Sequence, residues 1–211
     1  MPTDESEQRM EFMLTLRQRG ISDKAVLRAM DQVPREHFVE ARFADSAYAD
    51  QAMPIACGQT ISQPYVVAYM TEQLAVRGNH RVLEVGTGSG YQAAVLARLA
   101  GEVYSVEIVE ELARRAAQTL ERLGYTNITA RIGDGYQGWA EHAPYDGIVV
   151  TAAPDHVPPA LVAQLKPGGR LVIPVGGLFQ DLMVIAKAAD GTTTSTTIVP
   201  VRFVPLVRGG Q

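Results

Sequence analysis

One stretch decides the fold of this chain: Arg81-Val82-Leu83-Glu84-Val85-Gly86-Thr87-Gly88-Ser89-Gly90-Tyr91-Gln92. A short apolar run leads into three alternating glycines, and a helical pattern follows over residues 93–97. This order predicts a buried strand, a tight turn and a helix. Glycine allows sharp turns and close approach of a ligand to the main chain, and the first N–H groups of a helix attract polar ligands. We therefore expect a nucleotide-like ligand over Gly86–Gly90.

The same alternation of strand and helix continues after this stretch. We expect strands at residues 81–85, 103–107, 128–132, 146–151 and 170–174, and helices at 91–100, 109–123 and 157–165. Strands separated by helical crossovers form a parallel sheet. Residues 182–188 and 193–204 flank Asp190-Gly191, a hairpin signal, so antiparallel strands are expected to close the sheet.

Residues up to about 48 have no strand pattern, and we interpret them as a helical N-terminal addition. After a frayed tail up to about residue 8, Met10, Met13 and Leu14 fall at helical spacing. A second helix is expected to be capped by Ser22 and stapled by Ile21. Its inward residues are expected to be Val26, Leu27 and Met30.

A long connection, residues 50–64, then leads into a helix that begins near Pro64 and has Val67, Met70 and Leu74 on its apolar face. A connection of this length is either functional or disordered. Its mixture of proline, glycine and apolar residues argues against disorder.

Composition excludes several classes of protein. The 211 residues are 46% hydrophobic and 20% charged, with a net charge of -4 and no block of lysine or arginine, which disfavours nucleic-acid binding. Cys57 is the only cysteine and the four histidines lack metal-ligand spacing, so we expect no disulfide within the chain and no metal. No stretch is long and apolar enough for a bilayer span, and the acidic N-terminus is unlike a signal peptide, so we expect a cytoplasmic protein without membrane contact.

The glycine pattern discriminates between nucleotide ligands. A dinucleotide fold needs G-x-G-x-x-G, but Tyr91 stands in the place of the third glycine, and no Gly-Lys-Ser/Thr of a phosphate-binding loop follows. The form E-x-G-x-G-x-G, Glu84 to Gly90, resembles motif I of the S-adenosylmethionine-dependent methyltransferases. The fold expected is therefore a Rossmann-like α/β methyltransferase fold.

Acids at other strand ends fit the same ligand. Glu107 can accept both ribose hydroxyls, Asp134 can accept from the adenine amino group beside the Gly135 N–H, and Glu84 lies near the amino-acid part of the ligand. An acid at a strand end is also often a solvated residue or a helix cap. Several such features at matching strand ends favour the ligand.

The methyl acceptor must be inferred from other segments. After the fourth strand the chain reads Thr151-Ala152-Ala153-Pro154, without the carboxylate or amide that an amine acceptor would need. This points away from nitrogen acceptors. A carboxylate acceptor is already anionic and needs no general base at neutral pH.

Further segments carry a resemblance to one family: Gly58-Gln59-Thr60-Ile61-Ser62-Gln63-Pro64, Gly133-Asp134-Gly135, Pro144–Ala153, Leu165–Leu171 and Val201–Leu206. Together they resemble protein-L-isoaspartate O-methyltransferase, from about Ile21 to Leu206. The chain departs from the usual family composition at Ala56-Cys57 and at Gly177–Asp181. We expect Cys57 to be a small buried thiol without chemistry.

The resemblance implies a repair enzyme that transfers a methyl group from S-adenosyl-L-methionine to the α-carboxylate of L-isoaspartyl residues, leaving S-adenosyl-L-homocysteine. Its partners would be age-damaged proteins and peptides, with D-aspartyl residues as secondary substrates, and we expect a monomer. One domain is expected over residues 1–211: about 9–64 as the helical addition and substrate loop, and 65–211 as the cofactor-binding core.

Site residues follow from the motifs and the resemblance. Ser62 is expected to hold the acceptor carboxylate through its hydroxyl; its alternative role is a helix N-cap. The substrate is also expected to contact Pro54, Ile55 and Val204. The residues expected around the cofactor are Gln59, Thr60, Ile61, Glu84, Gly86, Thr87, Gly88, Gly90, Glu107, Ile108, Asp134 and Gly135. Tyr91 is either core or cofactor wall, with core favoured.

Three alternatives remain open. The chain could methylate another carboxylate, a small molecule or RNA; it could be a binding module without catalysis; or it could use a nicotinamide cofactor.

Overall fold

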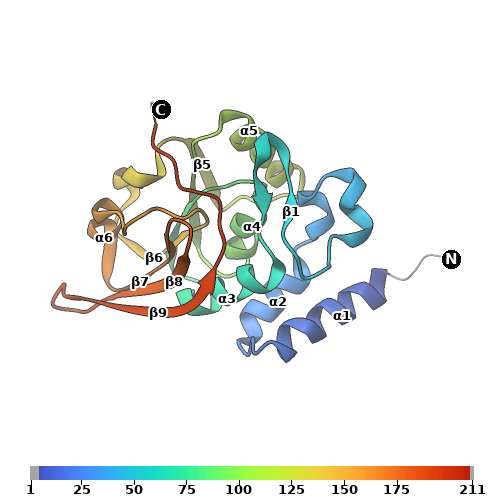
Figure 1. Cartoon of the computed structure of the whole chain (residues 1–211), viewed down its shortest axis with the longest axis horizontal. Coiled ribbons are helices and arrows are strands. Elements are labelled where there is room, and N and C mark those ends of the chain that lie inside the picture. The colour runs from blue at the N-terminus through green and yellow to red at the C-terminus, as the bar shows by residue number, and fades with distance from the viewer. Residues whose placement is uncertain (1–4, 210–211) are drawn as a thin grey trace.

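The stretch at residues 81–97 forms the strand, turn and helix that its sequence predicts: β3 (Arg81–Val85) and α4 (Tyr91–Ala97). The computed structural model describes residues 5–209, and within them β3 is an interior strand of a seven-stranded sheet, between β4 and β6 (Figure 1). The strand order is β5-β4-β3-β6-β7-β8-β9. The other strands are β4 (Glu102–Glu107), β5 (Ile128–Ile132), β6 (Tyr145–Val150), β7 (Leu165–Gly176), β8 (Gln180–Lys187) and β9 (Thr193–Val201).

The sheet is parallel from β5 to β7, and β8 and β9 add antiparallel, as predicted. The predicted hairpin is present between β8 and β9, where the Gly191 N–H donates to the Ala188 carbonyl (3.0 Å). The prediction was wrong at the start of β7. Residues 166–169 belong to β7 and are not a turn that ends the preceding helix. β7 already pairs with β6 at Leu165, and a shift in register between Tyr145 and Gly147 accommodates the two glycines.

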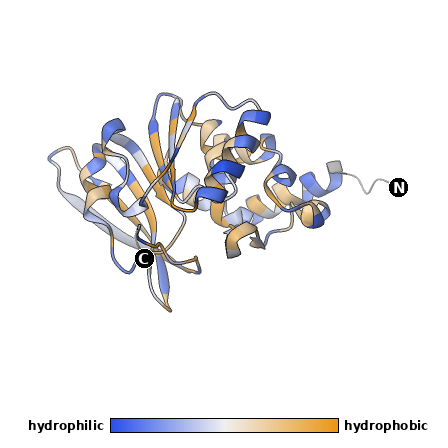
Figure 2. Ribbon diagram, turned by 90° about the horizontal axis from the view of Figure 1, so that it is seen from above, coloured by the Kyte–Doolittle hydropathy of each residue, from blue (hydrophilic) through white to orange (hydrophobic). Residues whose placement is uncertain are grey.

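Helices cover both faces of the sheet. On one face lie α3 (Pro64–Leu74), α4 and α5 (Glu110–Arg122), and on the other lie α6 (Pro159–Gln164) and the short 3-10 turns η4 (Gly135–Gln137) and η5 (Ala140–His142). Successive residues of a strand face opposite ways, so Val82 packs with α3 and α4 while Leu83 packs on the α6 side. Figure 2 shows the resulting layers, with hydrophobic segments along the central strands and along the helices that pack against them.

The N-terminal addition consists of α1 (Glu5–Gln18), α2 (Lys24–Gln32) and the 3-10 turns η1 (Arg35–Phe38) and η2 (Ala41–Ser46). The expected frayed tail is helical from Glu5 onward, and residues 1–4 lie outside the described residues. The expected apolar face of α1 is wrong for two of its three residues, because Met10 and Leu14 are exposed and only Met13 packs partly against the core. The buried residues of α1 are Phe12 and Leu16.

The second helix buries the predicted residues, but its cap differs. The Asp23 side chain accepts from the Ala25 and Val26 N–H groups, while Ser22 donates to Glu72 instead. Asp23 is one residue closer to the helix, so its carboxylate reaches the first orphan N–H groups.

The connection at residues 50–64 is ordered around a two-stranded antiparallel ladder, β1 (Met53–Pro54) with β2 (Thr60–Ile61). Between them the turn η3 (Ala56–Gly58) places Cys57 in the left-handed region at φ 58°. Cys57 is exposed, so the prediction of a buried thiol was wrong: the tight turn projects it away from the core, toward Glu111.

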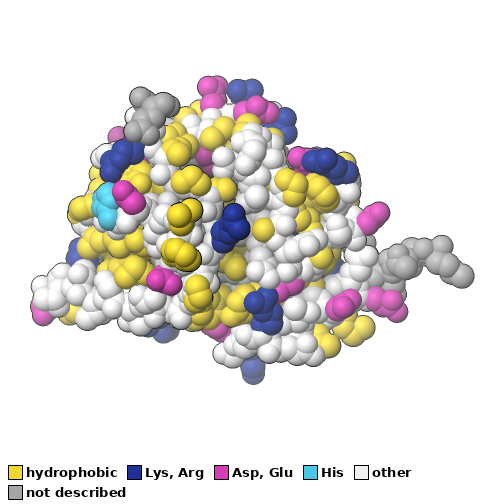
Figure 3. Space-filling view, viewed as in Figure 1, with side chains coloured by type: hydrophobic (Ala, Val, Ile, Leu, Met, Phe, Trp, Pro, Cys, Tyr) yellow, Lys and Arg dark blue, Asp and Glu magenta, His cyan; other side chains and the backbone are white. Residues whose placement is uncertain are grey.

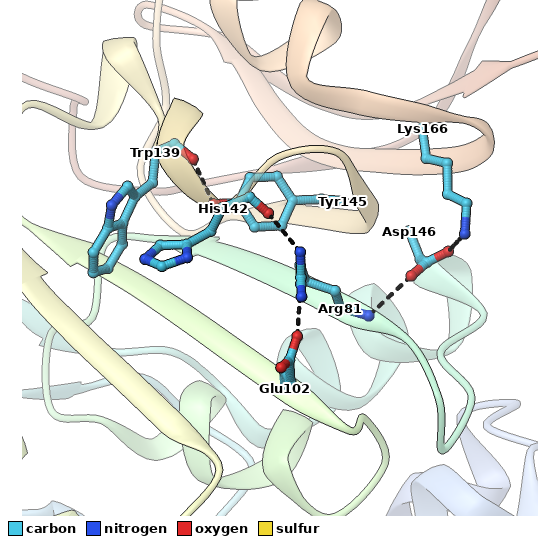
Figure 4. A network of polar contacts seen from close by, with 7 residues as sticks. All are labelled: Arg81, Glu102, Trp139, His142, Tyr145, Asp146 and Lys166. Carbon is cyan, nitrogen blue, oxygen red and sulfur yellow. Dashed lines mark hydrogen bonds and ion pairs between the residues drawn. The ribbon is translucent and has the colours of Figure 1, made fainter.

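A polar network ties the amino ends of the central strands together (Figure 4). The Arg81 guanidinium donates to Glu102 (2.6 Å) and to the His142 carbonyl (3.2 Å), and the Arg81 N–H donates to Asp146 (2.9 Å). Lys166 donates to the second oxygen of Asp146 (2.8 Å). These contacts hold the strands together at their amino ends. The carboxyl ends of β3 and β4, at the opposite end of the strands, are left for a ligand. Within residues 5–209, no helix is long and apolar enough to cross a membrane.

Candidate active site

A cavity lies at the carboxyl ends of β3, β4 and β6, where ligands of open α/β sheets bind. It encloses about 1030 Å³ of empty space, open solvent at its mouth included. Of the predicted site residues, it is lined by Gln59, Thr60, Ile61, Ser62, Gly86, Thr87, Gly88, Glu107, Ile108, Gly135 and Val204. The structure therefore brings the glycine turn and the loop around Ser62 to one cavity, although they lie far apart in the sequence.

The glycine turn is held against the end of β6. Gly86 has φ +95°, and a Cβ there would collide with the hydroxyl of Thr151. That hydroxyl donates to the Gly86 carbonyl (2.6 Å). Thr151 is a site residue that the sequence did not predict, because a threonine after a strand carries no signal of its own.

Glu107 organises the cofactor side of the cavity. Its Oε2 accepts from the Gly88 N–H (2.8 Å) and its Oε1 from the Val109 N–H (2.9 Å). The side chain is nearly buried, and each carboxylate oxygen keeps a further lone pair. Glu107 can thus accept from a ligand diol while it holds the glycine turn.

Glu84 is not where the sequence suggested. It does not line the cavity, because the pleat of β3 points it with Val82 into the face of the sheet that α3 and α4 cover. Ser105 Oγ donates to Glu84 and also lies 2.5 Å from Thr87 Oγ1. Complete burial raises the pKa of Glu84 to about 8, against the hydrogen bond from Ser105. Glu84 therefore supports the glycine turn from behind.

Gly90 and Asp134 also lie outside the cavity lining. Gly90 (φ +89°) begins α4, and a Cβ there would press on Ala116 of α5 at 3.3 Å. Asp134 caps η4 by accepting from the Tyr136 N–H (2.9 Å), and its other oxygen accepts from the Gly209 N–H (3.2 Å). Gly135 does line the cavity, so the segment is placed as expected while the Asp134 carboxylate acts on the backbone.

The loop around Ser62 forms the other wall. Ser62 is partly exposed and is not the helix cap, since Gln63 holds that position at α3 without a side-chain bond. The Ser62 carbonyl accepts from the guanidinium of Arg35 (2.8 Å), which also donates to Ala47 O (2.8 Å). Burial lowers the pKa of Arg35, and the guanidinium lies over the Tyr91 ring at 4.5 Å. Sequence reasoning missed Arg35, because residues 35–48 carry no periodic pattern.

Of the expected substrate contacts, Val204 lines the cavity but Pro54 and Ile55 do not. Ile55 is buried and its N–H closes a turn onto Gln59 O (2.9 Å), whereas Pro54 is exposed on β1. Tyr91 is core, at 1% exposure, and also touches the cavity. The remaining lining residues, which sequence reasoning did not assign to the site, are Val67, Met70, Val85, Ser89, Gln92, Val106, Val109, Leu112, Thr151, Ala152, Pro205, Leu206 and Val207.

These features fit an adenosyl ligand without a pyrophosphate. The turn brings bare backbone to the cavity at Gly86 and Gly88, and a carboxylate stands at the end of the second strand of the motif. A mostly parallel sheet with this site defines the class of S-adenosylmethionine-dependent methyltransferases.

Comparisons with known proteins identify the family within that class. Residues 7–211 match the family model of protein-L-isoaspartate(D-aspartate) O-methyltransferase, and the chain belongs to that family. Among curated relatives, a protein-L-isoaspartate O-methyltransferase 1 from Anaeromyxobacter sp. is 60% identical over 89% of this chain and 90% of its own length. A relative from Parvibaculum lavamentivorans is 54% identical over 98% and 95%.

Solved structures agree. A protein-L-isoaspartate O-methyltransferase superimposes with a TM-score of 0.85 at 32% identity, covering 93% of this chain and 65% of that one. A structure from Plasmodium falciparum, described as an enzyme of this family in complex with S-adenosyl-L-homocysteine, gives 0.82 at 27% identity, covering 93% and 97%. The expected family and fold are thereby confirmed.

Proposed function

We propose that this cavity transfers a methyl group from S-adenosyl-L-methionine to the α-carboxylate of an L-isoaspartyl residue, with Ser62 holding the acceptor. The observation that carries the proposal is the shared cavity: the glycine turn and Ser62 line the same space from opposite segments of the chain. The family membership supports the same activity. The substrates are then damaged proteins and peptides.

The chain's residues have to position and shield rather than move protons. Bound S-adenosylmethionine supplies a methyl group activated by its sulfonium. Glu107 would accept from the ribose hydroxyls, and the backbone at Gly86 and Gly88 would let the ligand lie close to the strand ends. The Ser62 hydroxyl would hold one acceptor oxygen and leave the other free to attack the methyl group. No general base is required, because the acceptor carboxylate is already ionised near pH 7.

The apolar lining contributes by excluding water. Val67, Met70, Val85 and Val106 line the cavity beside the glycine turn. Removal of water strengthens the hydrogen bond from Ser62 and protects the activated methyl group from hydrolysis. The backbone amide nitrogen of the residue that follows then attacks the ester carbonyl, methanol leaves and a succinimide forms. Hydrolysis of that ring returns part of the damage to normal aspartate.

Substitution of Ser62 tests the role of the acceptor loop. We expect Ser62→Ala to lower kcat/KM for an isoaspartyl peptide by roughly 10- to 100-fold, because it removes a hydrogen bond to a charged group. Affinity for S-adenosyl-L-homocysteine, measured by calorimetry, should stay unchanged. Ser195→Ala on the exposed face of β9 is the matched control. Unchanged turnover in Ser62→Ala would remove Ser62 from the mechanism.

The activity itself is tested with a pair of peptides that differ only in isoaspartyl against aspartyl linkage. Methylation of the isoaspartyl peptide alone is expected. Equal methylation of both would reject repair specificity, and failure to bind S-adenosyl-L-homocysteine would reject a methyltransferase altogether. A monomeric state, a cytoplasmic location and the absence of a nucleic-acid or membrane partner stay predictions.

A further inference from the structure

Two large apolar side chains project almost entirely into solvent at one turn. Leu178 is 99% exposed and Phe179 is 92% exposed, in the connection between β7 and β8. A single exposed apolar residue needs no explanation, but an adjacent pair this exposed marks a contact surface.

The backbone of this turn is held in place, so the exposed pair has a defined position. Gly176 (φ +133°) makes the turn tight, because a Cβ there would collide with the Phe179 carbonyl. The Gly176 N–H donates to the Pro154 carbonyl (2.9 Å). Gln180 binds the backbone of Phe203 twice, accepting from its N–H (2.6 Å) and donating to its carbonyl (3.0 Å).

These anchors place the turn beside the mouth of the cavity. Phe203 precedes Val204, Pro205, Leu206 and Val207, which line the cavity, and Pro154 follows the cavity residue Ala152 closely in the chain. Val207 is itself 48% exposed, so it adds to the apolar surface at the mouth. Figure 3 shows hydrophobic side chains gathered near the middle of the face where Figure 1 draws the ends of β7 and β8 and the segment after β9.

We propose that Leu178 and Phe179 form a subsite for an apolar side chain of the substrate polypeptide next to the isoaspartyl residue. The inference rests on the proposed function: an acceptor residue inside a polypeptide leaves chain on both sides, and that chain must lie across the cavity mouth. The subsite thereby gives this enzyme a preference for damaged sites that have apolar neighbours.

Another occupant fits the surface less well. A stable contact with a second copy of the chain would need roughly 800 Å² on each partner, far more than a two-residue turn offers. A bilayer surface rich in anionic lipid would repel a chain with a net charge of -4. The substrate polypeptide needs only a small contact, since the cavity itself supplies the remaining binding.

The test compares two isoaspartyl peptides, one with leucine and one with glycine beside the damaged residue. For the double variant Leu178→Ser/Phe179→Ser we expect KM for the leucine peptide to rise about tenfold, from lost apolar burial. KM for the glycine peptide and kcat for both should stay unchanged. The matched control is Met10→Ser/Leu14→Ser, which removes two exposed apolar side chains from α1.

The possible outcomes separate the two proposals. Equal changes in KM for both peptides, no change for either, or the same change in the α1 control would overturn the subsite. A shift in sedimentation of the wild type that the double variant abolishes, with both KM values unaltered, would assign the turn to self-association and overturn it as well. Failure of the wild-type protein to methylate either peptide would instead reject the proposed function.

Discussion

At the scale of single residues, Glu84 makes stability depend on pH. Burial raises its pKa to about 8, whereas an exposed glutamate titrates at about 4.3. Between these values the unfolded chain has released the proton that the folded protein keeps, so stability falls as pH rises toward 8 and then levels off. The stability that Glu84 adds to the folded protein is fully present below the pKa that this residue has in the unfolded chain. It is on the order of a few kcal/mol.

Glu84→Gln removes this titration, and Ser105 can still donate to the amide oxygen. We expect the urea midpoint of the wild type, compared with that of the variant, to decline between pH 5 and pH 8. Exposed Glu121→Gln should track the wild type throughout. Parallel profiles for wild type and Glu84→Gln would show that the carboxyl is already ionised in the folded protein.

The same residue shows what a motif can predict. Gly86 and Glu107 line one cavity, as their places at neighbouring strand ends of a parallel sheet lead one to expect, whereas Ser62, which also lines it, was assigned through the family resemblance and not through spacing. It misplaced Glu84, because a motif locates a residue along the chain while the pleat decides which face it occupies. Arg35 could not be found at all, since its link to the Ser62 carbonyl depends on packing between segments without periodicity.

At the scale of elements, the turn between β3 and α4 depends on glycine for two separate reasons. Gly86→Ala would strain a left-handed backbone by about 1–2 kcal/mol and also drive a methyl group into Thr151. Gly124→Ala at the end of α5 carries only the first cost, since Gly124 (φ +75°) has no atom within 4 Å of the added carbon. It is therefore the control.

We expect Gly86→Ala to lower the free energy of unfolding by about 1–3 kcal/mol more than Gly124→Ala, and to weaken S-adenosyl-L-homocysteine binding. Urea titration and calorimetry measure the two effects. If both variants lost equal stability and bound the ligand equally, the close packing of the turn against β6 would be refuted.

Elements were predictable where one physical signal dominated. The strands of the parallel sheet lie between turn signals and alternate with helical patterns, and the predicted β3 and β5 coincide with the observed ones. Prediction failed for the face of α1 and the start of β7. In α1, Phe12 and Leu16 face the core although Met10 and Leu14 have the same spacing in the sequence. In β7, pairing with β6 begins at Leu165, before the glycines that predicted a turn.

At the scale of the whole molecule, the helical addition and the α/β core share one hydrophobic interior. Phe12 and Leu16 of α1 belong to the same buried cluster as Ala93 of α4 and Leu112 of α5. Figure 1 shows α1 and α2 beside α3, while α6 lies at the opposite side of the molecule. We therefore expect the two parts to unfold together, as a single domain.

Phe12→Ala tests this, because the residue lies in the addition while Trp139, the only tryptophan, packs on the α6 side of the sheet. Truncating a buried phenylalanine should cost about 3–5 kcal/mol. If the molecule is one cooperative unit, tryptophan fluorescence and far-ultraviolet circular dichroism will shift to lower urea by the same amount. If the addition unfolds separately, the circular dichroism will acquire an early transition while the Trp139 signal keeps its wild-type midpoint, and the loop that carries Ser62 will be lost before the cofactor site.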